Sequence, residues 1–277
     1  MRRLILVLCG LLALAPAARA APRVVSMNLC ADELVLRLAD REQIASVSFL
    51  AAERRISTAA DLVGDIPLNH GMAEEVVRLA PDLVIAGRYT TRTTVGLLRD
   101  LDLPVLDLDV PATFEAVEDQ IREVASALGH PARGEAMIAG MEAALAAIPP
   151  RSQPARALVL RPNGLTAGPG SLVDTLLTRA GFINIGRDPA LQGYSGLPLE
   201  WVVSLRPDYL VLDTEPAPSP ALAHALLHHP VLAHLPFELR VIGVPNRLWT
   251  CAGPAMVEAV ALLAGVSPVF SAEGRYP

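Results

Sequence analysis

Residues 74–86 read EEVVRLAPDLVIA, and residues 200–212 read EWVVSLRPDYLVL. Six positions of the two segments are identical, and the copies lie 126 residues apart (200 − 74). Repeats of about 20 to 50 residues are typical of solenoid proteins. This spacing is much longer, so it predicts two related lobes within one chain.

Each copy reads as a short helix, a Pro-Asp turn and a strand. Pro81 ends the first helix, because proline has no amide hydrogen with which to continue the helical hydrogen-bond ladder. Asp82 supports the turn, and the apolar run LVIA is the following strand. Pro207, Asp208 and the run YLVL repeat this arrangement in the second copy.

Short apolar runs alternate with helical patterns along the rest of the chain. Residues 28–31 read as a turn, and Asp32 opens a helix whose apolar residues share one face. Strand–helix alternation predicts α/β lobes with mostly parallel sheets flanked by helices on both faces. The expected strands are residues 23–26, 44–48, 83–86, 105–108, 157–160, 209–212 and 240–244.

A longer helical region separates the two lobes. Residues 113–128 keep helical spacing, Gly129 and Pro131 interrupt the pattern, and a second helix continues to Ile148. The segment PPRSQP at residues 149–154 reads as a stiff boundary. We therefore predict a signal peptide at residues 1–20, an N-terminal lobe at 21–130, a connector helix at 131–150 and a C-terminal lobe at 151–277.

The first 20 residues have the pattern of a cleavable secretory signal peptide. Arg2 and Arg3 precede an apolar run at residues 4–15, and residues 18–20 form an A-x-A cleavage site. That run is too short to anchor the chain in a bilayer. Cleavage before Ala21 would remove three arginines and change the net charge from −6 to −9. An exported, acidic chain argues against a nucleic-acid partner.

Four stretches of the chain carry a family resemblance. They are RVVSMN from residue 23, GMAEEVVRLAPDLVIAG from residue 71, LTAGPGSLVDTLLTRAGFINIG from residue 165 and LEWVVSLRPDYLVL from residue 199. They resemble the class III periplasmic binding proteins, which serve ABC importers for iron-siderophores, vitamin B12 and haem. The resemblance implies two α/β lobes joined by a long helix, a ligand cleft between the lobes, and a periplasmic monomer.

The same resemblance implies a docking role for the glutamate that begins each copy. In this family an exposed Glu on each lobe pairs with Arg residues of the membrane permease, and the matching positions are Glu74 and Glu200. Glu75 is the fallback in the first lobe. The rival interpretation is helix-dipole stabilisation, worth about 0.3–1 kcal/mol for each residue.

Loops that follow the strands supply the candidate ligand contacts, because ligands of parallel α/β sheets bind beyond the carboxyl ends of the strands. Aromatic faces and arginine donors gather in these loops, although only 4% of the chain is aromatic. They suit a flat, partly anionic ferric siderophore, and a corrinoid fits nearly as well. The candidates are Asn28, Arg88, Tyr89, Arg92, Arg161, Tyr194, Arg247 and Trp249.

Two cysteines, Cys30 and Cys251, remain after cleavage of the signal peptide. Both fall in loops expected to face the cleft, one in each lobe. A disulfide between them would tie the lobes together, whereas free thiols could touch the ligand. The sequence leaves both possibilities open.

A zinc-binding protein is one alternative. His224 and His228 have helical i, i+4 spacing, with His229 and His234 nearby, but Pro230 interrupts this segment. A specific zinc site needs ligands from both lobes, and only His70 is a plausible ligand in the first lobe. We therefore expect no metal site.

An exported α/β enzyme is the other alternative. The chain contains none of the motifs G-x-G-x-x-G, G-x-x-x-x-G-K and G-x-S-x-G. Residues 168–171 (GPGS) could suggest a phosphate loop, but Ser171 reads as a helix N-cap. We therefore expect no catalytic residue and no cofactor.

Overall fold

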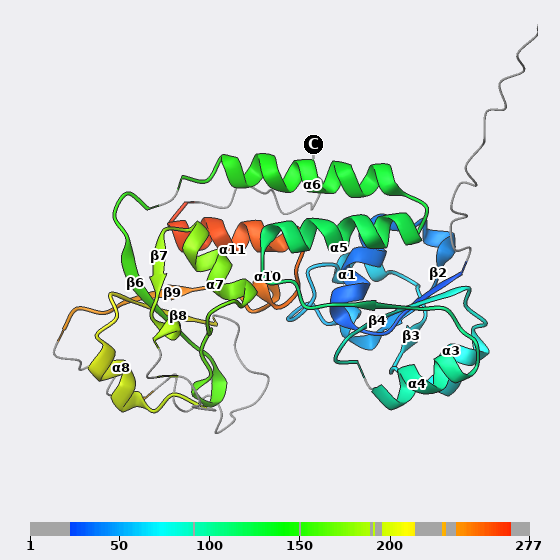
Figure 1. The fold of residues 1–277 in the computed structure, drawn as a ribbon, viewed down its shortest axis with the longest axis horizontal. Coiled ribbons are helices and arrows are strands. Elements are labelled where there is room, and N and C mark those ends of the chain that lie inside the picture. The colour runs from blue at the N-terminus through cyan, green and yellow to red at the C-terminus, as the bar shows by residue number, and fades with distance from the viewer. Residues whose placement is uncertain are drawn as a thin grey trace, which may run out of the picture.

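A computed structural model shows two α/β lobes that lie side by side along the long axis of the molecule (Figure 1). The structure describes residues 23–90, 92–149, 151–188, 191, 196–213, 229–230 and 237–266. None of the helices within these residues is long and apolar enough to span a membrane.

The N-terminal lobe contains a five-stranded sheet in which every pairing is parallel, in the order β3-β2-β1-β4-β5. The C-terminal lobe contains a four-stranded parallel sheet in the order β7-β6-β8-β9. The expectation of two lobes with parallel sheets is thus confirmed. The strands are β1 (Val24–Ser26), β2 (Ile44–Ser48), β3 (Leu68–Asn69), β4 (Leu83–Gly87), β5 (Val105–Leu108), β6 (Ala155–Leu160), β7 (Phe182–Asn184), β8 (Tyr209–Leu212) and β9 (Arg240–Gly243).

Helices cover both faces of the two sheets. The pair α5 and α6 runs along one side of the molecule across both lobes, while α3 and α8 lie on the opposite side (Figure 1). The helices are α1 (Leu29–Leu38), α2 (Ala60–Val63), α3 (Ala73–Arg78), α4 (Arg92–Asp100), α5 (Phe114–Ala127), α6 (Pro131–Ala146), α7 (Leu172–Arg179), α8 (Leu199–Leu205), α10 (Arg247–Thr250) and α11 (Ala255–Ala264).

Arginine side chains fasten α6 to both lobes. Near its start, Arg133 donates to the carbonyl of Leu38 at the end of α1 and to the carboxylate of Asp40. Beyond its end, Arg179 of α7 donates to the carbonyl of Ile148 at 3.1 Å. Charged donors make the stronger hydrogen bonds of a protein. The connector is therefore held at both ends.

One hydrophobic core extends through both lobes. It includes Ile85 of the first sheet, Val159 and Val211 of the second, and the inner faces of α5, α6 and α11. Neighbouring strand residues point the other way, so Val84 packs in a separate cluster under α3 and α4, and Leu210 in one under α8. Burial on both faces explains why the strands read as continuous apolar runs.

The repeated segments occupy equivalent places. Each runs from a helix (α3 or α8) to the strand next to the first strand of its lobe, β4 beside β1 and β8 beside β6. The residues before the two prolines, Ala80 and Arg206, share a left-handed backbone, with φ of 44° and 45°. Proline disfavours the right-handed helical region for the residue that precedes it. The Pro-Asp turn thus has one geometry in both lobes.

Three details differ from the sequence prediction. Helix α1 begins at Leu29 and not at Asp32, because the side chain of Asn28 caps it by accepting a hydrogen bond from the amide of Ala31 at 2.9 Å. The short strands β3 and β7 were not predicted. Ser171, in contrast, caps α7 as expected, accepting from the amide of Asp174 at 3.2 Å.

Candidate ligand cleft

The carboxyl ends of the N-terminal sheet surround one open cavity of about 600 Å³. Each strand delivers a residue to it one or two positions beyond its end. The strand order reverses between β1 and β4, and this is the point at which open parallel sheets bind ligands. The five strands β1 to β5 contribute, in that order, Asn28, Phe49, His70, Arg88 and Asp109.

Asn28 connects the loops that follow β1 and β4 at the point where the strand order reverses. Its side-chain oxygen caps α1, and its amide donates to Oγ1 of Thr90 at 3.1 Å. A Cβ atom added to Gly87 would lie 2.4 Å from Nδ2 of Asn28, so any other residue at position 87 would push this side chain out of its place. The loops after β1 and β4 therefore form one rigid corner of the cavity.

Apolar and aromatic groups form most of the wall. The ring of Phe49 stacks on that of His70, with 5.2 Å between centroids and 22° between planes. Tyr89 is 75% exposed and Val110 is 62% exposed, although both are large apolar side chains that normally prefer burial. A patch of this kind is typical of a ligand surface.

His70 is oriented by the acidic residue Glu75. The Nδ1 atom of the ring lies 3.1 Å from Oε1 of Glu75, and the backbone amide of His70 donates to Oε2 at 2.7 Å. Because a carboxylate only accepts, the neutral tautomer that fits this contact has its proton on Nδ1 and its lone pair on Nε2. His70 thus presents a directed acceptor beside the aromatic wall.

The charged side chains that line the cavity balance one another. Arg88 and Asp109 form an ion pair at 3.1 Å, and they are the only Arg, Asp or Glu residues among the described lining residues. The cavity wall in the described part of the chain therefore carries no large excess of either charge.

The C-terminal lobe closes the cavity through Leu172, Trp249, Thr250 and Ala252. Trp249 lines the cavity but is only 3% exposed, so it offers much less stacking surface than an open platform would. Its indole Nε1 is buried and has no hydrogen-bond partner among the residues that the structure describes. The guanidinium carbon of Arg161 lies 5.3 Å from the centre of the Trp249 ring.

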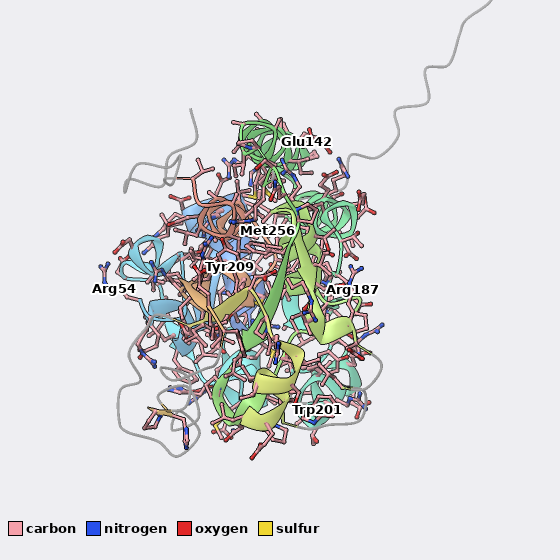
Figure 2. All side chains as sticks on the ribbon, turned by 90° about the vertical axis from the view of Figure 1, so that its left-hand side faces the viewer. Arg54, Glu142, Arg187, Trp201, Tyr209 and Met256 are labelled. Atoms are coloured by element: carbon pink, nitrogen blue, oxygen red, sulfur yellow. A yellow bond between two sulfur atoms is a disulfide. The ribbon has the colours of Figure 1, made fainter. Side chains whose placement is uncertain are left out.

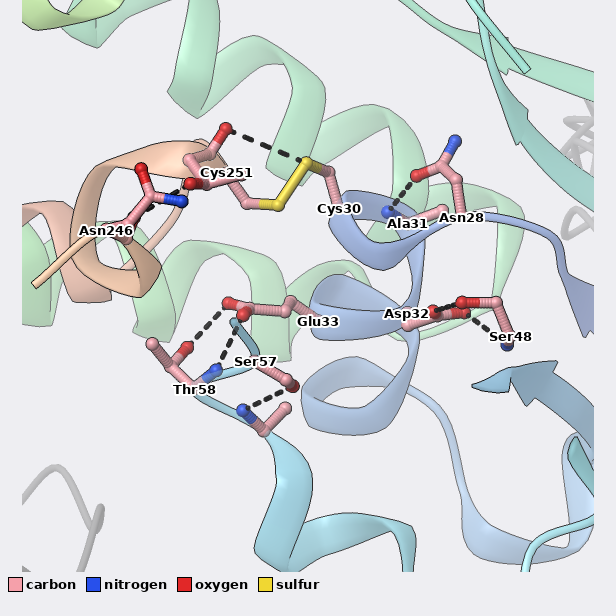
Figure 3. Close-up of a disulfide and its surroundings, with 12 residues drawn as sticks. Asn28, Cys30, Ala31, Asp32, Glu33, Ser48, Ser57, Thr58, Asn246 and Cys251 are labelled. Atoms are coloured by element: carbon pink, nitrogen blue, oxygen red, sulfur yellow. Dashed lines mark hydrogen bonds between the residues drawn. A yellow bond between two sulfur atoms is a disulfide. The ribbon is translucent and has the colours of Figure 1, made fainter. Parts of the chain in front are cut away.

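A disulfide joins the lobes beside the cavity. Cys30, at the start of α1, is bonded to Cys251, which follows α10, and their Cα atoms are 5.0 Å apart (Figure 3). A second link is the hydrogen bond from Oγ1 of Thr175 to the carbonyl of Ala112 at 2.6 Å. The structure thus contains the bonded form of the two cysteines, and both links limit separation of the lobes.

The candidate ligand residues divide into three groups. Asn28, Arg88, Tyr89 and Trp249 line the cavity, together with Cys30. Arg92, Arg161 and Arg247 are not among its lining residues. Tyr194 lies outside the residues that the structure describes.

Sequence reasoning missed several lining residues. Phe49 and Asp109 follow β2 and β5 directly, so the strand-end rule would have selected them had it been applied to every predicted strand. His70, which the sequence suggested only as a possible zinc ligand, follows β3, a strand of two residues that was not predicted. Gln120 and Leu172 lie on helices, and nothing in their local sequence marks them.

The two proposed docking glutamates lie on the same side of the molecule, in α3 and α8 (Figure 1). Glu74 and Glu200 are exposed, and neither carboxylate has a partner among the described residues. The carboxylate of Glu75 is occupied by His70 and by the amide of Met72. This difference supports Glu74 over Glu75 as the docking residue.

Metal ligands do not converge in the described part of the chain, where no group of three His, Cys, Asp or Glu residues could hold an ion. His224, His228 and His234 lie outside the described residues, whereas His229 lies within them.

Buried carboxylates fix α1 and the loops around it. Asp32 is fully buried and accepts hydrogen bonds from the amide of Ser48, at 3.0 Å, and from its hydroxyl (Figure 3). Ser48 ends β2 just before Phe49, so this contact positions the aromatic wall. Burial raises the pKa of Asp32 to about 6, although the hydrogen bonds from Ser48 favour the charged form.

We expect Asp32 to make the stability of the fold depend on pH. Its pKa is higher in the folded than in the unfolded chain, so its stabilising contribution is complete below about pH 4 and is lost as pH rises through about 6. The loss amounts to about 3 kcal/mol. Asp32→Asn should therefore gain about that much on the wild type between pH 4 and pH 7 in urea unfolding. A constant difference between the two proteins would contradict the assignment.

Two lobes with parallel sheets lie on either side of the cavity, and arginine hydrogen bonds hold helix α6 to both of them. This arrangement is that of a two-lobed solute-binding protein. The sequence profile of the family described as "Periplasmic binding protein" matches residues 24–238 of this chain. The chain belongs to that family. Its relatives are substrate-binding proteins, so the expectation of a binding protein rather than an enzyme is confirmed.

Individual relatives agree in fold. The chain is 29% identical over 211 residues to a protein of Halobacterium salinarum named "Cobalamin-binding protein", a match that covers 74% of this chain and 57% of the relative. This chain therefore spans little more than half of that protein. Among solved structures, the periplasmic haem-binding protein HutB of Vibrio cholerae matches with a TM-score of 0.70 and 18% identity, over 88% of this chain and 97% of the other. The periplasmic vitamin B12-binding protein BtuF of the same organism gives 0.63 and 18%, over 88% and 96%.

Proposed function

We propose that this protein captures a corrinoid such as cobalamin in the cavity between its lobes and delivers it to the membrane permease of an ABC importer. The observation that carries the proposal is a wide, mainly apolar wall whose charges are balanced by the Arg88–Asp109 pair. A corrin ring is large, flat and close to neutral, so it gains from apolar contact and needs few charged partners. The 29% identity to a protein named as cobalamin-binding supports the same choice.

An anionic siderophore fits this cavity less well. Recognition of a carboxylate- or catecholate-rich chelate requires several arginines that are not already paired. Of the four candidate arginines, only Arg88 lines the cavity, and Asp109 neutralises it. A neutral hydroxamate chelate does not require unpaired arginines, so the test includes one.

Haem is the second candidate, and His70 is the observation that favours it. Its Nδ1–H is held by Glu75, which is the arrangement that orients a histidine for metal ligation through Nε2. The ring also stacks on Phe49 and faces the cavity. A haem iron bound here would take His70 as an axial ligand.

We also infer that the chain works in the periplasm after removal of residues 1–20, which lie outside the described residues. Support comes from the signal-peptide pattern and from the family match.

Calorimetric titration of the mature protein with cyanocobalamin, haemin, a ferric catecholate, a ferric hydroxamate and Zn²⁺ tests the proposal. We expect saturable binding of cyanocobalamin, weakened about 10- to 100-fold by Phe49→Ala, because aromatic anchors dominate binding energy. Leu97→Ala, which shortens an exposed apolar residue of α4 away from the cavity, is the matched control and should bind normally.

His70→Ala separates the two candidates. If haem is the ligand, haemin binds tightly to the wild type, and the variant loses the absorption spectrum of histidine-ligated haem. Binding of haemin, a siderophore or Zn²⁺ without any binding of cyanocobalamin would refute the corrinoid proposal.

A further inference from the structure

Helix α10 is a bridge between the two lobes. Its start is held by the C-terminal lobe, because the amide of Asn246 donates to Oδ1 of Asp213, the residue after β8, at 3.0 Å. Its end is held by the N-terminal lobe, because Cys251 directly follows α10 and is bonded to Cys30 in the first turn of α1 (Figure 3). Each end of this four-residue helix is therefore fixed to a different lobe.

The bridge carries most of the cavity wall that the C-terminal lobe supplies. Among the described lining residues of this lobe, Trp249 and Thr250 belong to α10, and Ala252 follows it by two positions. On the N-terminal side, the lining residue Asn28 lies two positions before Cys30, which also lines the cavity. The disulfide thus joins the two lobes where their lining segments meet.

The N-terminal end of this link is a rigid point. Asn28 caps α1 and donates to Thr90, which holds the loops after β1 and β4 together. One turn further along α1, Asp32 accepts from the amide of Ser48 at 3.0 Å. Cys30 lies between these two anchored residues. The disulfide therefore attaches α10 to a fixed corner of the cavity.

The two cysteines differ in their position relative to the cavity. Cys30 is partly exposed, lines the cavity, and has its Sγ 3.9 Å from the carbonyl oxygen of Thr250. Cys251 is only 3% exposed and is not among the lining residues. A substitution at Cys251 therefore breaks the bond without changing a residue of the cavity wall.

We propose that the disulfide between Cys30 and Cys251 positions α10 for ligand binding, so that the bonded protein binds its ligand more tightly than the protein with two thiols. This proposal rests on the proposed function, because it gives the bond a role in capturing the cargo. A wall that is already fixed loses little freedom when the ligand binds. A wall attached to one lobe must first be ordered, and this cost is subtracted from the binding free energy. Both cysteines are then positioning residues.

Calorimetric titration with cyanocobalamin tests the proposal on the mature wild type, Cys251→Ser and Cys30→Ser, at a temperature where all three are folded. Both variants should bind about 10-fold more weakly than the wild type. Stopped-flow measurements should assign this loss mainly to faster dissociation. Equal affinity of the wild type and Cys251→Ser would overturn the proposal. A loss in Cys30→Ser alone would also overturn it, because it would indicate direct contact of Cys30 with the ligand.

Ile138→Ala is the matched control for lower stability. Ile138 is a core residue of α6, is 2% exposed and does not line the cavity. Truncation of a buried isoleucine destabilises a protein by an amount comparable to the loss of a disulfide. This variant should nevertheless bind with wild-type affinity. If it loses as much affinity as Cys251→Ser, lower stability alone explains the loss, and the positioning role is refuted.

Hydrogen exchange measures the position of α10 without any ligand. Reduction of the wild type with dithiothreitol should speed amide exchange in α10 more than in β6, an interior strand of the second sheet. An unchanged ratio of the two exchange rates would overturn the proposal while leaving the corrinoid function intact. If cyanocobalamin does not bind even the wild type, the proposed function fails, and this ratio decides on its own whether the bond holds α10 in place.

Discussion

Removal of the disulfide should cost this protein about 3–5 kcal/mol of its free energy of unfolding. The bond joins Cys30 to Cys251 across 221 residues of sequence, and the chain-entropy model predicts the largest stabilisation for long loops. A loss of this size lowers the melting temperature of a domain of this length by about 10 °C or more. Calorimetry of the mature wild type and of Cys30→Ser measures it.

The control uses a reducing agent. Reductant should bring the wild type down to the melting temperature of Cys30→Ser, and it should leave the variant unchanged. Because Thr175 still bonds to Ala112 and the core remains shared, we expect the variant to fold. Two reactive thiols in the denatured, unreduced wild type would show that the bond does not form.

Reversal of both proposed docking charges, Glu74→Arg with Glu200→Arg, should strongly reduce delivery while leaving ligand affinity unchanged. Loss of one member of an interfacial charge pair costs about 2–5 kcal/mol, and each reversed residue would also repel the arginines that the family resemblance implies on the permease. Transport into vesicles that contain the permease should therefore fall at least tenfold. Neither residue is among those that line the cavity.

Glu142→Arg is the matched control for the docking variant. Glu142 is an exposed glutamate of α6, on the side of the molecule opposite Trp201 of α8 (Figure 2). This variant changes the net charge in the same direction, but it should transport normally. Normal transport by the double variant, or an equal loss in the control, would refute the docking assignment.

The sequence predicted the two lobes well, because the strands and turns that build them depend on residues close together in the chain. Apolar runs became strands, and the two Pro-Asp turns became equivalent turns with Ala80 and Arg206 in the same conformation. Strand β3 could not be predicted in this way, since its two residues carry too little pattern. Its only signal is pairing with β2, a contact made in three dimensions.

The candidate site was harder to predict, because burial depends on the partner lobe. Trp249 was expected to offer an open stacking face, and residue type alone supports that expectation. In the structure α10 places it against the core, where Arg161 covers it. The sequence showed His70 as a possible ligand but not its surroundings. Its ring stacks on Phe49 only because the loops after β2 and β3 meet in the folded structure.

The hydrophobic core that passes through both lobes changes the meaning of the repeat. Ile121 of α5 and Ile138 of α6 belong to the same cluster as Leu176 of α7 and Val260 of α11. Opening either lobe would expose apolar surface on the other, so neither half is an autonomous folding unit. The internal duplication in the sequence is a duplication of architecture, and we expect the two halves to unfold together in one cooperative transition.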